Sequence, residues 1–278
     1  MQGPVKYYLG DGRHAEGIHI ANGQMLNTKH INKFGYNGAV GSTFELIGVS
    51  SANIVYPTVA GYVSIVSTEL DDDGTDLDME GAYTVKIDGL DGDYNEQSVT
   101  LTLNGTTAVT TQGMGPDGAD ITFLRVFRMS VETSFDENGA VGVITAGIYR
   151  VSDTTLLTQA TINPAYDNQT LQAAYTVPAG KTAYMIRMQA TATKDNKAGM
   201  VAIHTREYDD VPSTATKPWK VKQIAEVFQN NVTVEFPVPL LIPEKTDIEL
   251  RGKCLSQLSQ NTMGIGGTYD LLLVDNPS

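Results

Sequence analysis

Alternation of apolar and polar residues is the feature that most constrains how this chain can fold. Residues 82–89 alternate with a period of two, and residues 98–103 repeat the pattern as Ser-Val-Thr-Leu-Thr-Leu. This period places successive side chains on opposite faces, so it indicates strands that are buried on one face. An Asn-Gly pair at 104–105 follows, and such a pair is the strongest short-range signal for a β-hairpin. The sequence therefore predicts a hairpin whose returning strand covers residues 106–111.

Further strand-like runs follow one another with turn residues about every 8–12 positions, as in sandwiches and barrels. They cover residues 44–49, 61–67, 121–131, 142–150, 171–177, 182–190, 199–206, 232–236, 246–252 and 269–274. No long helical pattern separates them, which argues against a parallel α/β sheet. Residues 222–230 fit a helix and a strand equally well. We predict an all-β fold, an antiparallel β-sandwich of jelly-roll-like type.

The positions of glycine and proline predict where the chain divides into structural parts. Residues 112–118 read Gln-Gly-Met-Gly-Pro-Asp-Gly, a cluster that breaks strands. Residues 1–35 are rich in Gly, His and Asn and show no period, so they indicate an irregular N-terminal arm, either disordered or docked on a neighbouring subunit. The predicted division is an arm at 1–35, a first β-sandwich half at 36–115 and a second, jelly-roll-like half at 116–278.

Charge and cysteine content exclude several classes of function. The net charge is −13, so phosphate backbones and anionic membrane surfaces are repelled, and we expect no direct nucleic-acid or membrane partner. The single cysteine, Cys254, cannot form an intrachain disulfide. Neither a secretory signal nor a run of about 18 apolar residues is visible. We expect assembly in the cytoplasm.

An acidic loop at residues 69–80 is the sharpest candidate for a metal site. Glu69, Asp71 and Asp73 fall on positions one, three and five of a calcium loop, and Glu80 falls on position twelve. Calcium needs six to eight oxygen ligands, which such a density of carboxylates supplies. Against this, Asp76 occupies a position that is normally apolar, and the flanks resemble strands. The alternative is a solvated acidic turn, and the same choice applies to the acidic turn at 91–96.

Catalytic motifs are weak or incomplete. Gly-Lys-Thr at 180–182 resembles a phosphate loop, but the required earlier glycine is replaced by Tyr175 and a strand follows where a helix is needed. A Cys254–His204 catalytic pair stays open, although a free cysteine is more often a small buried hydrophobe. A carbohydrate hydrolase with unidentified carboxylates also stays open. We expect a protein that is not an enzyme.

Several stretches of the chain match one group of proteins, and none of them is a catalytic motif. The matching segments are Asn-Lys-Phe-Gly-Tyr-Asn at 32–37, Val-Lys-Ile-Asp-Gly-Leu-Asp at 85–91, residues 101–109, residues 123–128, Ala-Tyr-Thr-Val-Pro-Ala-Gly-Lys-Thr-Ala-Tyr at 174–184, and residues 242–251. With these segments the chain resembles structural proteins of tailed phages of marine bacteria, including cyanophages.

This resemblance implies a non-enzymatic virion component that is bound to other virion proteins and forms a homo-oligomer. Its expected place is a capsid decoration or knob protein on the outer shell, with major capsid or tail proteins as partners. The alternative is a tail, collar or fibre component, one that could bind host-surface glycans. Exposed aromatic residues near Tyr208 or Trp219 would favour glycan binding.

Overall fold

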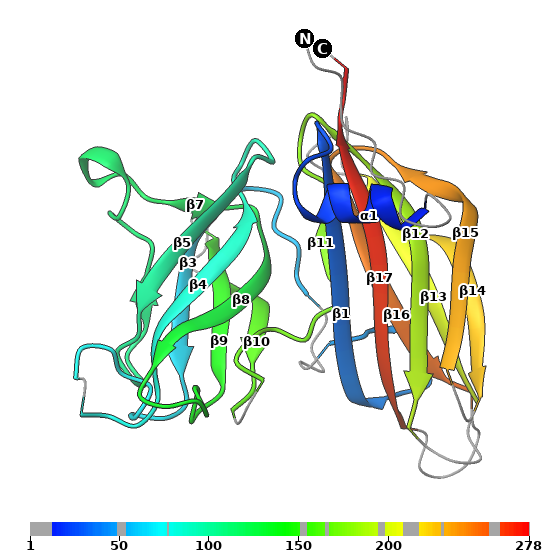
Figure 1. Cartoon of the computed structure of the whole chain (residues 1–278). Coiled ribbons are helices and arrows are strands. Elements are labelled where there is room, and N and C mark those ends of the chain that lie inside the picture. Colours follow the sequence, from blue (N-terminus) through cyan, green and yellow to red (C-terminus); the bar gives the residue numbers. More distant parts are fainter. Residues whose placement is uncertain are drawn as a thin grey trace.

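The computed structural model describes residues 13–48, 54–76, 78–150, 155–164, 167–193, 198–207, 217–228, 231–255 and 262–277. Across these ranges the protein is built almost wholly from antiparallel strands, which confirms the all-β prediction (Figure 1). Helical structure in them is limited to α1 (Arg13–Ala21) and one 3₁₀ turn at Pro116–Gly118. No helix of the described part is long and apolar enough to cross a membrane.

The strands form two lobes that stand side by side (Figure 1). The terminal lobe contains β1 (Thr28–Val40), β2 (Glu45–Leu46), β11 (Ala174–Thr176), β12 (Lys181–Ala192), β13 (Ala198–Glu207), β14 (Lys220–Phe228), β15 (Asn231–Ile242), β16 (Thr246–Cys254) and β17 (Met263–Asp275). The central lobe contains β3 (Gly61–Ser67), β4 (Ala82–Leu90), β5 (Glu96–Thr102), β6 (Val109–Thr110), β7 (Thr122–Phe123), β8 (Arg125–Ser134), β9 (Ile144–Arg150) and β10 (Thr155–Ile162).

The terminal lobe is a sandwich of two sheets with strand orders β1-β17-β12-β15 and β11-β16-β13-β14, with β2 paired to β16. Alternate residues of β17 point into the core, among them the buried Ile265, Tyr269 and Leu271. Gly267 lies in the same inward row, where a Cβ atom would come within 2.5 Å of the Leu250 side chain. A side chain at position 267 would therefore force the Leu250 side chain to shift.

The central lobe is a second sandwich with its own core. Its sheets have strand orders β10-β9-β3-β6, with β7 paired to β3, and β5-β4-β8. Val85 and Ile87 of β4 face Ile65 of β3 and Ile148 of β9 in one buried cluster. The Asn-Gly turn at 104–105 is present, with Gly105 at φ 53°. The strand after it, however, pairs with β3 instead of β5, so the chain crosses to the other sheet there.

The structure divides the chain differently from the sequence prediction. β3 pairs with β7 and β9, so hydrogen bonds join residues on both sides of the predicted boundary at 112–118. The central lobe is an insertion, because Gly48 and Gln172 form a β-bridge where the chain leaves and re-enters the terminal lobe. The breaker cluster at 112–118 is a turn inside the central lobe, which is why it resembled a boundary.

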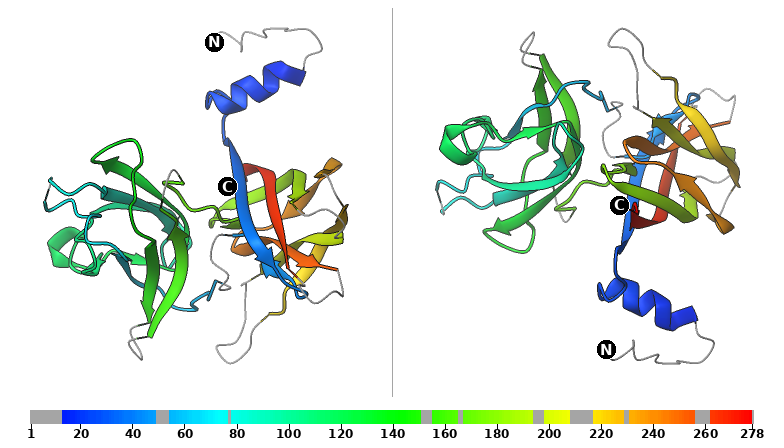
Figure 2. Two further views of the ribbon diagram at one scale, coloured as in Figure 1. Left: turned by 90° about the horizontal axis from the view of Figure 1, so that it is seen from below. Right: turned by 90° about the horizontal axis from the view of Figure 1, so that it is seen from above.

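The N-terminal arm is more ordered than predicted wherever it is described. Residues 1–12 lie outside the described part, but α1 is followed by β1, which pairs with β17 along most of its length. Figure 2 shows α1 projecting from the end of β1, away from both sandwiches. The ambiguous run at 222–230 is a strand as far as Phe228, because Ala225 and Val227 pack against the terminal core; residues 229–230 lie outside the described part.

The insertion predicts which fragment can fold alone. A fragment of residues 54–170 keeps both sheets and the complete core of the central lobe, so we expect a β-type circular dichroism spectrum and one cooperative thermal transition. A matched fragment of residues 36–115 lacks β7 to β10, and we expect it to remain unfolded. Cooperative melting of the second fragment, with none for the first, would show that this description of the lobes is wrong.

Candidate functional site

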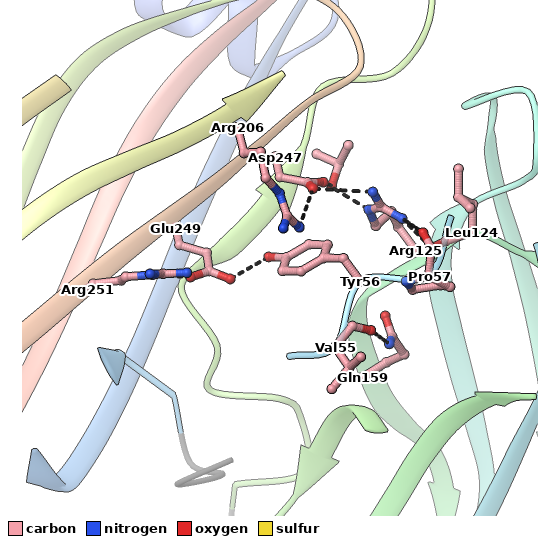
Figure 3. Close-up of polar contacts among 11 residues, drawn as sticks. Val55, Tyr56, Pro57, Leu124, Arg125, Gln159, Arg206, Asp247, Glu249 and Arg251 are labelled. Atoms are coloured by element: carbon pink, nitrogen blue, oxygen red, sulfur yellow. Dashed lines mark hydrogen bonds and ion pairs between the residues drawn. The ribbon is translucent and has the colours of Figure 1, made fainter. Parts of the chain in front are cut away.

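A charged strand face at the junction of the lobes is the most elaborate polar site in the described residues. In β16 the residues at 248, 250, 252 and 254 face the terminal core, so Asp247, Glu249 and Arg251 share the opposite face. Arg206 of the neighbouring β13 projects from the same side of the sheet (Figure 3). Asp247 and Glu249 are nevertheless buried, because residues 55–57 and Arg125 of the central lobe cover them.

Arg125 makes the central contact across the junction. Its Nε atom lies 2.9 Å from one Asp247 carboxylate oxygen, and its second terminal nitrogen lies 3.2 Å from the other. The remaining terminal nitrogen donates to the carbonyl oxygens of Pro57 and Leu124, each at 2.8 Å (Figure 3). The pair is almost fully buried, at 2% and 0% exposure. Such a bidentate pair fixes orientation as well as distance.

Asp247 gathers further donors from its own lobe. Arg206 lies 3.2 Å from one of its oxygens, and the Thr176 hydroxyl donates to the other at 2.6 Å. Burying a carboxylate is expensive unless its lone pairs are satisfied. Here each of the two oxygens accepts two hydrogen bonds, so the charge is compensated in place.

Tyr56 links the same segment to Glu249. Its hydroxyl donates to Glu249 at 2.7 Å, and Arg251 lies 2.5 Å from the other carboxylate oxygen. The Tyr56 ring stacks edge-on against Trp219, with centroids 5.7 Å apart, and the Arg206 guanidinium lies between 4 and 5 Å from both rings. Trp219 is therefore engaged in the junction, while Tyr208 lies outside the described residues.

Burial sets the titration behaviour of this cluster. It raises the pKa of Glu249, although Arg251 opposes the effect. Burial also raises the pKa of Tyr56 well above its usual value, helped by the charges of Glu249 and Asp247. It lowers the pKa of His204, whose ring packs against Phe44 at 5.1 Å. These groups face packed side chains, so the arrangement can fix two lobes in one orientation.

The junction predicts a large stability effect at one position. Arg125→Met removes the cation and leaves Asp247 buried, which should lower the free energy of unfolding by about 3–5 kcal/mol. The matched control is Lys29→Met, which breaks the exposed Lys29–Glu96 pair and should cost at most about 1 kcal/mol. Urea unfolding followed by circular dichroism measures both. Equal effects of the two substitutions would contradict this description of the junction.

The described residues of the acidic loop show no cluster of metal ligands, and calcium binding there stays a prediction. No group of three or more His, Cys, Asp or Glu side chains within the described ranges is arranged to hold a metal ion, and Glu69, Asp71, Asp73 and Glu80 all lie in those ranges. Asp73 accepts bonds from the backbone and hydroxyl of Thr75, and the hydroxyl bond lowers its pKa. The Asp73 carboxylate therefore serves a local turn.

Asp72, which the calcium pattern skipped, is the organising residue of this loop. It is fully buried and accepts hydrogen bonds from the Ser67 hydroxyl and from the backbone N–H groups of Ala82, Val141 and Gly142. These bonds tie the loop to the start of β4 and to the turn before β9. Alternation could not reveal this role, because the seven acids of the loop look equivalent in sequence.

Asp72 predicts a second stability effect. Asp72→Asn replaces an acceptor for three N–H groups with an amide, which should lower the free energy of unfolding by about 2–3 kcal/mol. Asp71→Asn is the matched control and should change it by less than about 0.5 kcal/mol, because the Asp71 side chain is exposed. The melting temperature should be the same in calcium and in chelator. If calcium raised the melting temperature and Asp71→Asn abolished that increase, the loop would be a calcium site after all.

The other sequence candidates occupy structural positions. Cys254 is buried in the terminal core, whereas His204 lies on the opposite face and five residues away along the strand pair. At about 3.3 Å per residue they cannot touch. Lys181 begins a strand and pairs with Asp275. Asp91 bonds the backbone of its own hairpin tip, as expected for the acidic-turn alternative.

Comparisons with known proteins do not place the chain in a family. No family model matches it, and no curated protein matches it. Among solved structures, one titled as infectious bursal disease virus Gt strain shares 9% identity at a TM-score of 0.26 and covers 90% of this chain and 73% of that one. The Bacillus thuringiensis delta-endotoxin Cry8Ea1 shares 8% identity at a TM-score of 0.19, covering 86% and 55%. With both TM-scores well below 0.5, neither likeness assigns a function.

Proposed function

We propose that this protein is a non-enzymatic virion structural component, most specifically a decoration or knob protein on the outer shell of a tailed phage. The observation that carries the proposal is the projecting arm formed by α1 and the turn after it. Ile18, Met25 and Leu26 expose 47%, 42% and 87% of their surface there. Apolar side chains clustered on a projecting element are typical of contacts between subunits.

The body of the molecule supports the same role. β14 and β15 end their sheets, so each presents an unpaired edge that could recruit foreign strands. Pro237 and Pro239 interrupt the pairing of β15. The exposed face of β14 carries charged residues (Lys220, Lys222, Glu226) together with the apolar Ile224 and Phe228. A component made in many copies needs such protection from edge-to-edge aggregation. The net charge of −13 also favours soluble free subunits.

Protein composition of purified particles tests the proposal. We expect this chain in the particles in a copy number that scales with the major shell protein. Six or twelve copies would instead indicate a tail or collar component and would overturn the decoration role. Absence from purified particles would overturn the virion role altogether.

The arm predicts a specific assembly defect. The double variant Ile18→Ser, Leu26→Ser should reduce incorporation into particles at least tenfold, because it removes apolar surface from the arm without touching either core. Leu70→Ser is the matched control, since Leu70 is also exposed but lies on the central lobe. Quantitative mass spectrometry of complemented particles measures both. Normal incorporation of the double variant would contradict assembly through the arm.

A further inference from the structure

A cleft of about 490 Å³ lies between the lobes, apart from the buried junction. β1 of the terminal lobe forms one wall, and β4, β5 and β8 of the central lobe form the other. Its volume falls within the range of about 300–1,000 Å³ that is usual for small-molecule sites. The lining combines cations, amides and aromatic rings, so its chemistry can be compared with that of candidate ligands.

The charge of the cleft is opposite to that of the protein. Lys29, Lys33, Lys86 and Arg128 line it, against two acids, Asp88 and Glu96, whereas the whole chain has 19 basic and 32 acidic residues. Two of the four cations are paired, Lys29 with Glu96 at 3.0 Å and Lys86 with Asp88 at 3.1 Å. Lys33 and Arg128 form no ion pair with any described residue.

Of these two cations, Lys33 and Arg128, Lys33 is the one that is buried. It is only 8% exposed, and among the described residues its amine donates to one acceptor, the Phe127 carbonyl oxygen at 2.6 Å. An ammonium group has three donors, so two have no acceptor in the part of the chain that the structure describes, where the amine also lies 5.5 Å from the centre of the Phe127 ring. Burial, together with the charge of Arg128, lowers the pKa of Lys33 to about 7, although Asp88 opposes the shift. An anion placed between Lys33 and Arg128 would relieve both the repulsion and the missing hydrogen bonds.

The rest of the lining favours a ligand that carries hydroxyl groups. Asn32, Gln97 and Gln169 line the cleft. The nitrogen of Asn32 already donates to Thr268 and Asp270, that of Gln97 donates to the Thr122 carbonyl oxygen, and the oxygen of Gln169 accepts from Arg128. The side-chain oxygens of Asn32 and Gln97 and the side-chain nitrogen of Gln169 are the groups left for ligand hydroxyls. Phe34 and Tyr175 add aromatic surface, and the Tyr175 hydroxyl has no hydrogen-bond partner among the described residues. An acidic peptide offers carboxylates but few hydroxyls. A sugar acid offers one carboxylate, several hydroxyls and an apolar ring face.

We propose that the cleft between the lobes binds a carboxylate-bearing sugar of the hexuronic acid type, with the carboxylate held between Lys33 and Arg128. The amide side chains then contact the sugar hydroxyls, and the aromatic side chains contact the ring. This site does not depend on the virion role, because it is a property of the isolated chain.

Calorimetric titration of the purified full chain with D-glucuronic acid tests the site. We expect saturable one-to-one binding, at least tenfold weaker binding of D-glucose, and at least a tenfold loss in both Lys33→Met and Arg128→Gln. The second variant keeps the proposal testable if the first destabilises the fold, because Arg128 is exposed. Lys181→Met removes a cation paired with Asp275 outside the cleft and should bind normally.

Proton uptake gives an independent signature. At pH 8 the Lys33 amine is mostly neutral, so binding a carboxylate should take up nearly one proton and be about fivefold weaker than at pH 7. Lys29, Lys86, Asp88, Glu96 and Arg128 are the other charged groups facing the cleft. His30 also lines it and bonds to Asp270 at 3.0 Å, so the uptake should survive in His30→Gln.

Three results would overturn the proposal. They are an absence of saturable binding to glucuronic acid, equal binding of glucose and glucuronic acid, and unchanged affinity in both Lys33→Met and Arg128→Gln. If the peptide acetyl-Glu-Glu-amide bound more tightly than glucuronic acid, the cleft would be a site for acidic peptides, and the proposal of a sugar acid would be wrong. These titrations use the isolated chain and no virus particles. A negative result would therefore say nothing about the virion role, which is tested by the protein composition of purified particles.

Discussion

The buried ion pair between Arg125 and Asp247 is the interaction on which the arrangement of the two lobes depends. Arg125 begins β8 and follows the core residue Phe123 closely, and Asp247 precedes the core residue Ile248 in β16. Each partner is thus fixed by the packing of its own sandwich. A partial opening of the lobes would separate two charges before water could solvate them, which is costly. The junction therefore favours one closed arrangement over a range of hinge angles.

The junction also sets the geometry of the cleft. Phe127 lies two residues after Arg125, its ring packs against Tyr175 at 4.9 Å, and its carbonyl oxygen accepts the bond from Lys33. Lys33 belongs to the terminal lobe and Phe127 to the central lobe, so this bond also crosses between them. Any rotation of the lobes would change the position of the Lys33 amine relative to Arg128. The spacing of the two cations therefore depends on the buried ion pair outside the cleft as well as on the Lys33–Phe127 bond within it.

Alternation was sufficient to predict most strands but could not predict how they pair. β4 and β5 were predicted nearly to their ends, because their apolar residues alternate without interruption. The pairing of β1 with β17 joins Thr28 to Val274, and no local pattern encodes a contact so distant in sequence. Asp247, Glu249 and Arg251 alternate with core residues, which in sequence is typical of a solvated face. The burial of Asp247 depends on Arg125, which the sequence places inside an apolar run, and that of Glu249 depends on Tyr56.

The distribution of charge connects the two regions. Three arginines of the junction, Arg125, Arg206 and Arg251, and the four cations of the cleft make seven of the 19 basic residues of the chain. Concentrating cations between the lobes leaves the outer surface still more acidic than the net charge suggests, which disfavours non-specific association with anionic surfaces. In the junction the carboxylates of the protein itself neutralise these cations. In the cleft, Lys33 is buried and Arg128 is exposed, and neither forms an ion pair with a described carboxylate. Under our proposal, an external anion supplies the neutralising charge there.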